Sequence, residues 1–250
     1  KILFHRVKAL IYSFFIMADE INYDGYSETI GEWFVNLDDC VVSALELLSK
    51  SKIPRFDFSH FQRPFVAGSG NAIETGRILF QGIDAVFGDE SNYERELQKP
   101  VDGVIVISAS GGKDSPAISA AAKEKGIEAF LFTCNPNSPA IKYFEPGKVL
   151  VFPKQPEIYT YNTSTYLGMI LGKTNEDAGR ILNYIRQVID PLLVPDFSDF
   201  KGFYFIVPKE FHCVKKMFQI KVEELFGRRV GRDFYTPEFA RNHATDIVVN

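Results

Sequence analysis

Hydrophobic residues follow two different patterns along the chain. Short runs that are apolar at nearly every position alternate with longer stretches in which apolar residues recur at helical spacing. The short runs predict strands at 64–68, 84–88, 103–108, 129–133 and 149–152, and the longer stretches predict helices at 30–50, 71–82, 115–126, 160–172 and 175–190. Strands that are apolar throughout are typical of a parallel sheet covered on both faces. The pattern therefore predicts an α/β protein with a three-layer, doubly wound parallel sheet.

The pattern restarts on a smaller scale near the end of the sequence. Residues 190–199 contain two prolines and predict a linker. A strand at 202–208 and a helix at 211–227 follow it. We therefore expect three parts, which are an N-terminal extension (1–27), a complete α/β domain (28–190) and a shortened second α/β subdomain (200–250).

Composition narrows the classes of partner and site. The chain is 46% hydrophobic, and its net charge of −4 gives no basic surface for nucleic acid. Its three cysteines, Cys40, Cys134 and Cys213, lie far apart, and no CxxC or zinc-ligand spacing is present. The sequence thus predicts neither a disulfide framework nor a metal site, and a cytoplasmic protein is the default expectation.

The first 17 residues place basic side chains before the apolar stretch "ALIYSFFIMA". This stretch is too short to span a bilayer, and no small-x-small cleavage site follows it. We expect a packed N-terminal helix or an arm used in oligomer contact, with no role at a membrane. A secretory signal, and a true start at Met17, remain as alternatives.

Two of the predicted strands end in loops of small, hydroxyl-rich residues. The first loop is Gly68-Ser69-Gly70-Asn71, and the second runs from Ser108 to Ser115 as "SASGGKDS". Both lead directly into helices, and helix starts offer unpaired N–H groups and partial positive charge. Ligands of open parallel sheets bind beyond the carboxyl ends of the strands. Together the loops favour a site for a phosphate or a similar anion.

Two other interpretations of these loops remain. A dinucleotide fingerprint of the GxGxxG type would need a glycine at position 73, where the chain has Ile73. Alternatively, both loops are ordinary turns before capped helices, because Asp114 or Ser115 before Pro116 makes a good helix start on its own.

Four segments in order resemble the sugar isomerase (SIS) domain family over roughly residues 28–190. They are "VAGSGNAIETGRIL", "VISASGGKDSP", "FTCNPNSPAIKYFE" and "PEIYTYNTSTYLGMIL". The resemblance implies a five-stranded parallel sheet and phosphosugar ligands. In these segments the chain resembles the isomerase half of glucosamine-6-phosphate synthase. Near its end it resembles bifunctional phosphoglucose/phosphomannose isomerases.

The resemblance also implies which residues hold the ligand. They are Gly68, Ser69, Gly70, Asn71, Ser108, Ser110, Gly111, Lys113, Ser115, Asn162 and Thr163. Lys113 stands where the family usually has threonine, and a lysine can hold phosphate as a point charge.

The C-terminal part resembles the start of a second SIS subdomain. On that resemblance Glu224, in "QIKVEELF", is the isomerase base, and His243, in "TPEFARNHATDIV", opens the sugar ring. Other interpretations remain, because Glu224 with Lys221 also fits a solvated helical pair, Glu223 is an adjacent rival, and His243 also fits a surface turn.

These observations predict an aldose–ketose isomerase of a sugar phosphate, an intramolecular oxidoreductase that works through an enediol without metal, nucleotide or other cofactor. We expect a homodimer or homotetramer, because sites in this family often form between subunits. The alternatives are a non-catalytic phosphosugar sensor, which the shortened second half favours, and a phosphosugar lyase, hydrolase or deglycase on the same fold.

Overall fold

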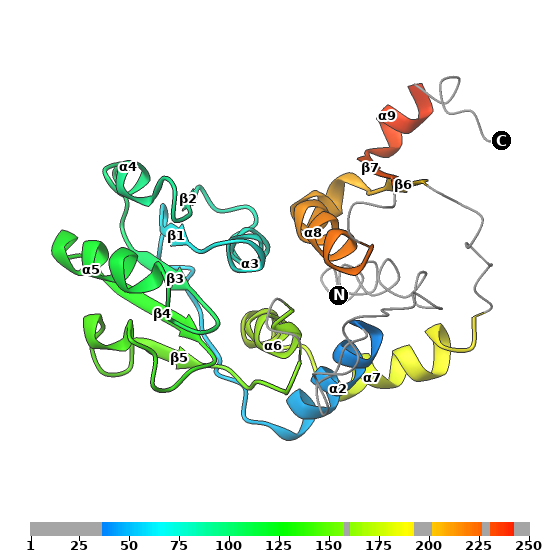
Figure 1. Ribbon diagram of the computed structural model, residues 1–250, viewed down its shortest axis with the longest axis horizontal. Helices are drawn as coiled ribbons and strands as arrows, with labels where there is room; N and C mark the ends of the chain where they lie inside the picture. Colours follow the sequence, from blue (N-terminus) through cyan, green and yellow to red (C-terminus); the bar gives the residue numbers. More distant parts are fainter. Residues whose placement is uncertain (1–36, 158–160, 193–201, 227–230, 243–250) are drawn as a thin grey trace.

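The structure is a computed structural model, and it describes residues 37–157, 161–192, 202–226 and 231–242 (Figure 1). The predicted extension over 1–27 lies outside the described residues, as does the linker from 193 onward. None of the described helices is both long and apolar enough to cross a membrane.

A five-stranded, wholly parallel sheet forms the centre of the molecule. Its strands are β1 (Phe65–Ala67), β2 (Val86–Gly88), β3 (Val104–Ile107), β4 (Ala129–Thr133) and β5 (Val149–Val151). Their order across the sheet is β2-β1-β3-β4-β5. The predicted parallel sheet is confirmed, and every one of its strands falls within a predicted strand.

Helices cover both faces of this sheet, which gives three layers (Figure 1). On one face lie α4 (Tyr93–Leu97) and α5 (Ser115–Lys125), and on the other lie α3 (Asn71–Leu79) and α6 (Thr163–Thr174), backed by α2 (Leu37–Lys50), α7 (Ala178–Tyr184) and the π-helix Ile185–Ile189. Alternate β3 side chains enter the two cores, because Ile105 and Ile107 pack with the α6 side while Val104 and Val106 pack with the α5 side. The predicted α/β class is thus confirmed.

A small second sheet follows, made of β6 (Gly202–Ile206) and β7 (Gly231–Tyr235), which pair in parallel. One face of β6 directs Phe205 against Phe218 of α8 (Lys215–Phe226) and against Phe234. The other face leaves Tyr204 and Ile206 more than half exposed. The chain ends its described part in α9 (Pro237–Asn242).

The structure differs from the predicted elements in two places. The helix predicted over 211–227 is divided into a 3-10 helix, Lys209–Val214, and α8 from Lys215. Phe211, Val214 and Met217 recur every third residue, a spacing that a 3-10 helix and an α-helix share, so the pattern could not locate the boundary. Helix α4 was not predicted, because five residues are too few to display a period.

Helix α8 lies beside α3 (Figure 1), and the contacts at their ends show that the two helices run antiparallel. At one end the Asn71 amide contacts Glu224, and at the other the Cys213 thiol contacts the side-chain oxygen of Gln81. The small second unit therefore rests on the helix that follows the first predicted loop. The predicted division of the chain into three parts stays a prediction.

Candidate functional site

The two predicted loops lie side by side at the carboxyl edge of the sheet. They follow β1 and β3, which are direct neighbours with Ala67 opposite Val106. The strand order reverses between these two strands, and in open α/β sheets the crevice at such a switch point is the usual ligand site. Their helices, α3 and α5, begin here and point their N-terminal N–H groups toward the crevice.

The first loop is shaped by a close approach of backbones at Gly68. A Cβ at this position would lie 3.0 Å from both Ala72 Cβ and the Ile107 carbonyl oxygen, so a larger residue would force the loop and α3 to move apart. Ser69 and Gly70 are exposed at the rim. The Ser69 hydroxyl donates to a carboxylate oxygen of Glu90, so a phosphate bound at Ser69 must displace that carboxylate.

The second loop is held by its own backbone. Ser108 Oγ accepts from Gly111 N–H, and Ser110 Oγ accepts from Gly112 N–H, both at 3.2 Å. Each hydroxyl therefore keeps its hydrogen for another acceptor. The buried Ser115 hydroxyl differs, because it donates to the Gly112 carbonyl at 2.9 Å and so stabilises the turn.

Residues at the end of β4 and directly after it hold the second loop through hydrogen bonds. The Ser138 hydroxyl donates to the Gly111 carbonyl at 2.9 Å, and Asn135 Nδ2 donates to the Ser110 carbonyl at 3.0 Å. Thr133 Oγ1 donates to the Ala109 carbonyl at 2.8 Å. The predicted segment "FTCNPNSP" thus acts on the loop through these bonds, which make it rigid.

Lys113 was predicted to contact the phosphate, but its side chain lies in solvent. Its side chain is 80% exposed, and its ammonium lies 3.7 Å from Asp114 Oδ2. In the described part of the chain no hydrogen bond joins it to the serine hydroxyls of its own loop. The structure therefore brings Ser108 and Ser110 together with the first loop, but leaves the Lys113 charge in solvent.

A third group of predicted residues lies at the start of α6. The buried carboxylate of Glu157 accepts from the Ser164 N–H and hydroxyl, both at 3.3 Å, which satisfies the first turn of this helix. Asn162 Oδ1 accepts from Lys154 Nζ at 3.2 Å. Thr163 Oγ1 is buried without a hydrogen-bond partner among the described residues.

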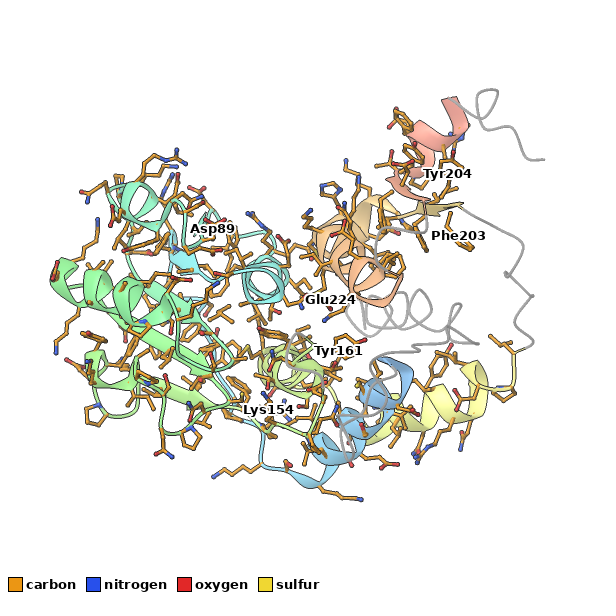
Figure 2. All side chains as sticks on the ribbon, in the orientation of Figure 1. Asp89, Lys154, Tyr161, Phe203, Tyr204 and Glu224 are labelled. Carbon is orange, nitrogen blue, oxygen red and sulfur yellow. The ribbon has the colours of Figure 1, made fainter. Side chains whose placement is uncertain are left out.

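Glu224 lies where α3, α6 and α8 meet (Figure 2). Its Oε1 accepts from Asn71 Nδ2 at 2.9 Å, and its Oε2 accepts from Lys221 Nζ at 2.7 Å. Lys221 Nζ also donates to the Tyr161 carbonyl at 3.3 Å and lies 5.2 Å from the Tyr161 ring centroid. The predicted base is therefore in contact with the first residue of α3, which also ends the first loop.

Lys221 is buried and its partner Glu224 is half-buried, which the sequence alone did not establish. The side chain of Lys221 is 7% exposed and that of Glu224 is 18% exposed. Burial lowers the pKa of Lys221, while Glu224, Glu157 and Cys40 act in the opposite direction. The alternative of a solvated surface pair is wrong. In the sequence, only the i,i+3 spacing of Lys221 to Glu224 indicated that these two residues interact.

His243, the predicted ring-opening residue, lies outside the described residues. Glu223, the adjacent rival for the base, is exposed on α8. Of the two predicted catalytic residues, the structure therefore locates Glu224.

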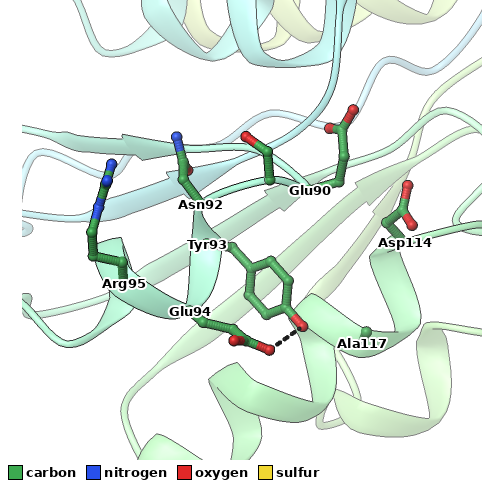
Figure 3. Close-up of a pocket in the computed structure, with 8 residues that line it drawn as sticks. Glu90, Asn92, Tyr93, Glu94, Arg95, Asp114 and Ala117 are labelled. Atoms are coloured by element: carbon green, nitrogen blue, oxygen red, sulfur yellow. Dashed lines mark hydrogen bonds between the residues drawn. The ribbon is translucent and has the colours of Figure 1, made fainter.

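A cavity of about 540 Å³ adjoins the two loops (Figure 3). It lies between α4 and the start of α5 and is lined by Glu90, Ser91, Asn92, Tyr93, Glu94, Arg95, Asp114 and Ala117. The Tyr93 hydroxyl donates to Glu94 Oε1 at 3.3 Å, and burial with the nearby carboxylates of Glu94 and Asp114 raises the pKa of Tyr93. Because three carboxylates line it, this cavity is a poor phosphate site.

In sequence, the chain matches no protein-family model and no curated protein. In structure, it is similar to a provisionally named sugar-binding protein from Salmonella typhimurium LT2, with a TM-score of 0.52 and 14% identity over 84% of this chain and 75% of that chain. It is also similar to a provisionally named phosphosugar isomerase from the same organism (TM-score 0.49, 13% identity, 84% and 70% covered) and to the C-terminal domain of glucosamine-fructose-6-phosphate aminotransferase from Francisella tularensis (TM-score 0.46, 14% identity, 84% and 70% covered). At such identities likeness extends to the fold alone, and the fold is the one that the resemblance to the sugar isomerase family predicted.

Proposed function

We propose that this protein is a phosphosugar isomerase, which interconverts the aldose and ketose forms of a hexose or pentose phosphate. The observation that supports this most is the position of Glu224. A carboxylate with restricted exposure is held at the first residue of α3, beside two glycine- and serine-rich loops suited to a phosphate. An anion site and a base are the two parts that this reaction needs.

The phosphate would bind between the starts of α3 and α5. The proposed contacts are Gly68, Ser69, Gly70, Ser108, Ser110, Gly111 and Ser115 on the two loops and the backbone N–H of Asn71, with Asn162 and Thr163 on the sugar side and Lys113 as a distant charge. The hydroxyls of Ser108 and Ser110 are the strongest candidates, since both accept from their own loop and can donate to the ligand. Binding of a phosphate remote from the reacting carbons orients the sugar for proton transfer.

Glu224 would carry the proton between C1 and C2 through the enediol. Its carboxylate is fixed by Asn71 and Lys221, yet its side chain is still 18% exposed and so accessible to a ligand. A base that is held close to its substrate and partly desolvated is suited to such a transfer. His243 is the proposed group for ring opening, since a histidine titrates near neutral pH.

We further propose a cytoplasmic homodimer or homotetramer, with a SIS domain at 28–190 and a partial second subdomain at 200–250. The similar sugar-binding protein from Salmonella keeps a second function open, in which the same loops hold a sugar phosphate without turnover.

Incubation with glucose, fructose and mannose 6-phosphates and with ribulose 5-phosphate tests the proposal. Glu224→Gln keeps an oxygen that can accept from Lys221 and should abolish turnover while leaving ligand affinity close to wild type. Glu223→Gln is the matched control, because it changes an exposed neighbour on the same helix. Turnover lost in Glu223→Gln would contradict the assignment of the base, and binding without any turnover would support the sensor.

A further inference from the structure

Asn71 occupies a position that joins the two halves of the proposed site. It is both the last residue of the first loop and the first residue of α3. Its side chain is 7% exposed, and its amide nitrogen donates to Glu224 Oε1. One residue therefore connects the anion loop to the proposed base on α8.

The direction of helix packing places this contact at the loop end of α3. Asn71 meets Glu224 near the end of α8, and Gln81, beyond the far end of α3, meets Cys213 just before α8 begins. Helix α8 thus lies antiparallel along α3 (Figure 1). The Asn71–Glu224 contact therefore lies at the end of α3 next to the first loop, and the Gln81–Cys213 contact lies at the other end.

The Glu224 carboxylate accepts hydrogen bonds from two side chains on different helices. Asn71 holds Oε1 from α3, and Lys221 holds Oε2 from the preceding turn of α8. Lys221 also donates to the Tyr161 carbonyl, so it ties the carboxylate to the segment before α6. The Asn71 hydrogen bond is the described side-chain contact that ties the carboxylate to the start of α3 and hence to the first loop.

We infer that Asn71 is a positioning residue that couples the first loop to Glu224. A phosphate bound at the Gly68–Gly70 loop fixes the first turn of α3, and the Asn71 amide then orients the base toward the sugar. The side chain of Asn71 serves the base, whereas the loop before it serves the phosphate. This role rests on the proposed function, since it concerns the same site.

Kinetics of Asn71→Leu test the inference, because leucine has a similar volume and no donor. We expect kcat to fall about ten- to hundredfold, as one hydrogen bond to a charged group is lost. The affinity for inorganic phosphate should stay within about twofold of wild type, because the loop is unchanged. Asn183→Leu, an exposed asparagine on α7, is the matched control and should change neither quantity. A weaker phosphate affinity with unchanged kcat would overturn the inference, since Asn71 would then act on the ligand.

Hydrogen exchange of the α8 amides, Lys215–Phe226, tests the coupling without turnover. Inorganic phosphate should slow this exchange in the wild type but not in Asn71→Leu. The double variant Asn71→Asp with Glu224→Gln exchanges donor and acceptor and should recover the protection, whereas Asn71→Asp alone should lose it. If phosphate binds but leaves α8 exchange unchanged in the wild type, the coupling is refuted. If α8 responds but no sugar phosphate is converted, the proposed isomerase fails and the coupling stands.

Discussion

Among the described glycines, Gly111 is the one at which an added Cβ would meet its neighbours most closely. Gly111 has a φ of +62°, and a side chain in that conformation costs about 1–2 kcal/mol. The added Cβ would overlap Oγ and Cβ of Ser138, so Ser138 must leave its place. Ser138 would then lose its bonds to the Gly111 carbonyl and to Ala140 N–H in a buried setting, at about 1–3 kcal/mol. We expect a total loss of about 2–5 kcal/mol in Gly111→Ala.

Urea unfolding followed by circular dichroism measures this loss as a lower midpoint at constant slope. Gly126→Ala is the matched control, because Gly126 has a similar φ of +69° and open space around its Cβ position, so only the backbone cost of about 1–2 kcal/mol applies. Adding Ser138→Gly to Gly111→Ala removes the overlapping atoms and should recover part of the difference. If Gly111→Ala and Gly126→Ala cost the same, the bracing of the second loop by Ser138 is not as described.

Three further predictions concern Glu224, Glu74 and Ser110. Glu224→Ala should destabilise the fold by about 3 kcal/mol, because it leaves the Lys221 ammonium, which is 7% exposed, without its carboxylate. Lys221→Met should cost less, because the Glu224 carboxylate that it leaves unpaired can be hydrated. Equal unfolding midpoints for the two variants would contradict this. Burial raises the pKa of Glu74 against the opposing charge of Arg77, so its stabilising contribution is complete below the ordinary pKa of 4.5 and is lost as pH rises through the raised value. Glu74→Gln should therefore raise the melting temperature at about pH 8 and not at about pH 4, and a gain independent of pH would show that the titration is irrelevant. Ser110→Ala should weaken the binding of glucose 6-phosphate, measured by calorimetry, by about 1–3 kcal/mol, and an unchanged affinity would remove Ser110 from the site.

Much of the central domain could be predicted because its signals are local. The strand at 129–133 has the predicted bounds, since an apolar run bordered by polar turns defines both ends. Gly126 ends α5 in a left-handed conformation, as its place after the last apolar position indicates. The short helix α4 gave no such signal, because its five residues are ordered by contacts with β2 and α5 rather than by their own periodicity.

The site could be predicted only in part, for the same reason. The two loops follow from residues that are adjacent in the sequence, and their pairing follows from the strand order. The contact of Asn71 with Glu224 joins residues 153 positions apart, and no spacing rule describes it. Lys113 shows the reverse case, since its residue type suits a phosphate but its backbone directs the side chain into solvent.

The antiparallel packing of α8 on α3 also has a consequence for the order of folding. The strands of the large sheet pair with neighbours that are near in the sequence, whereas α8 can reach α3 only after the whole sheet and the helices after it have been traversed. Contacts between distant segments form more slowly than local ones. A chain in the course of folding therefore forms the two loops at the sheet edge first, and Glu224 reaches its place beside Asn71 last.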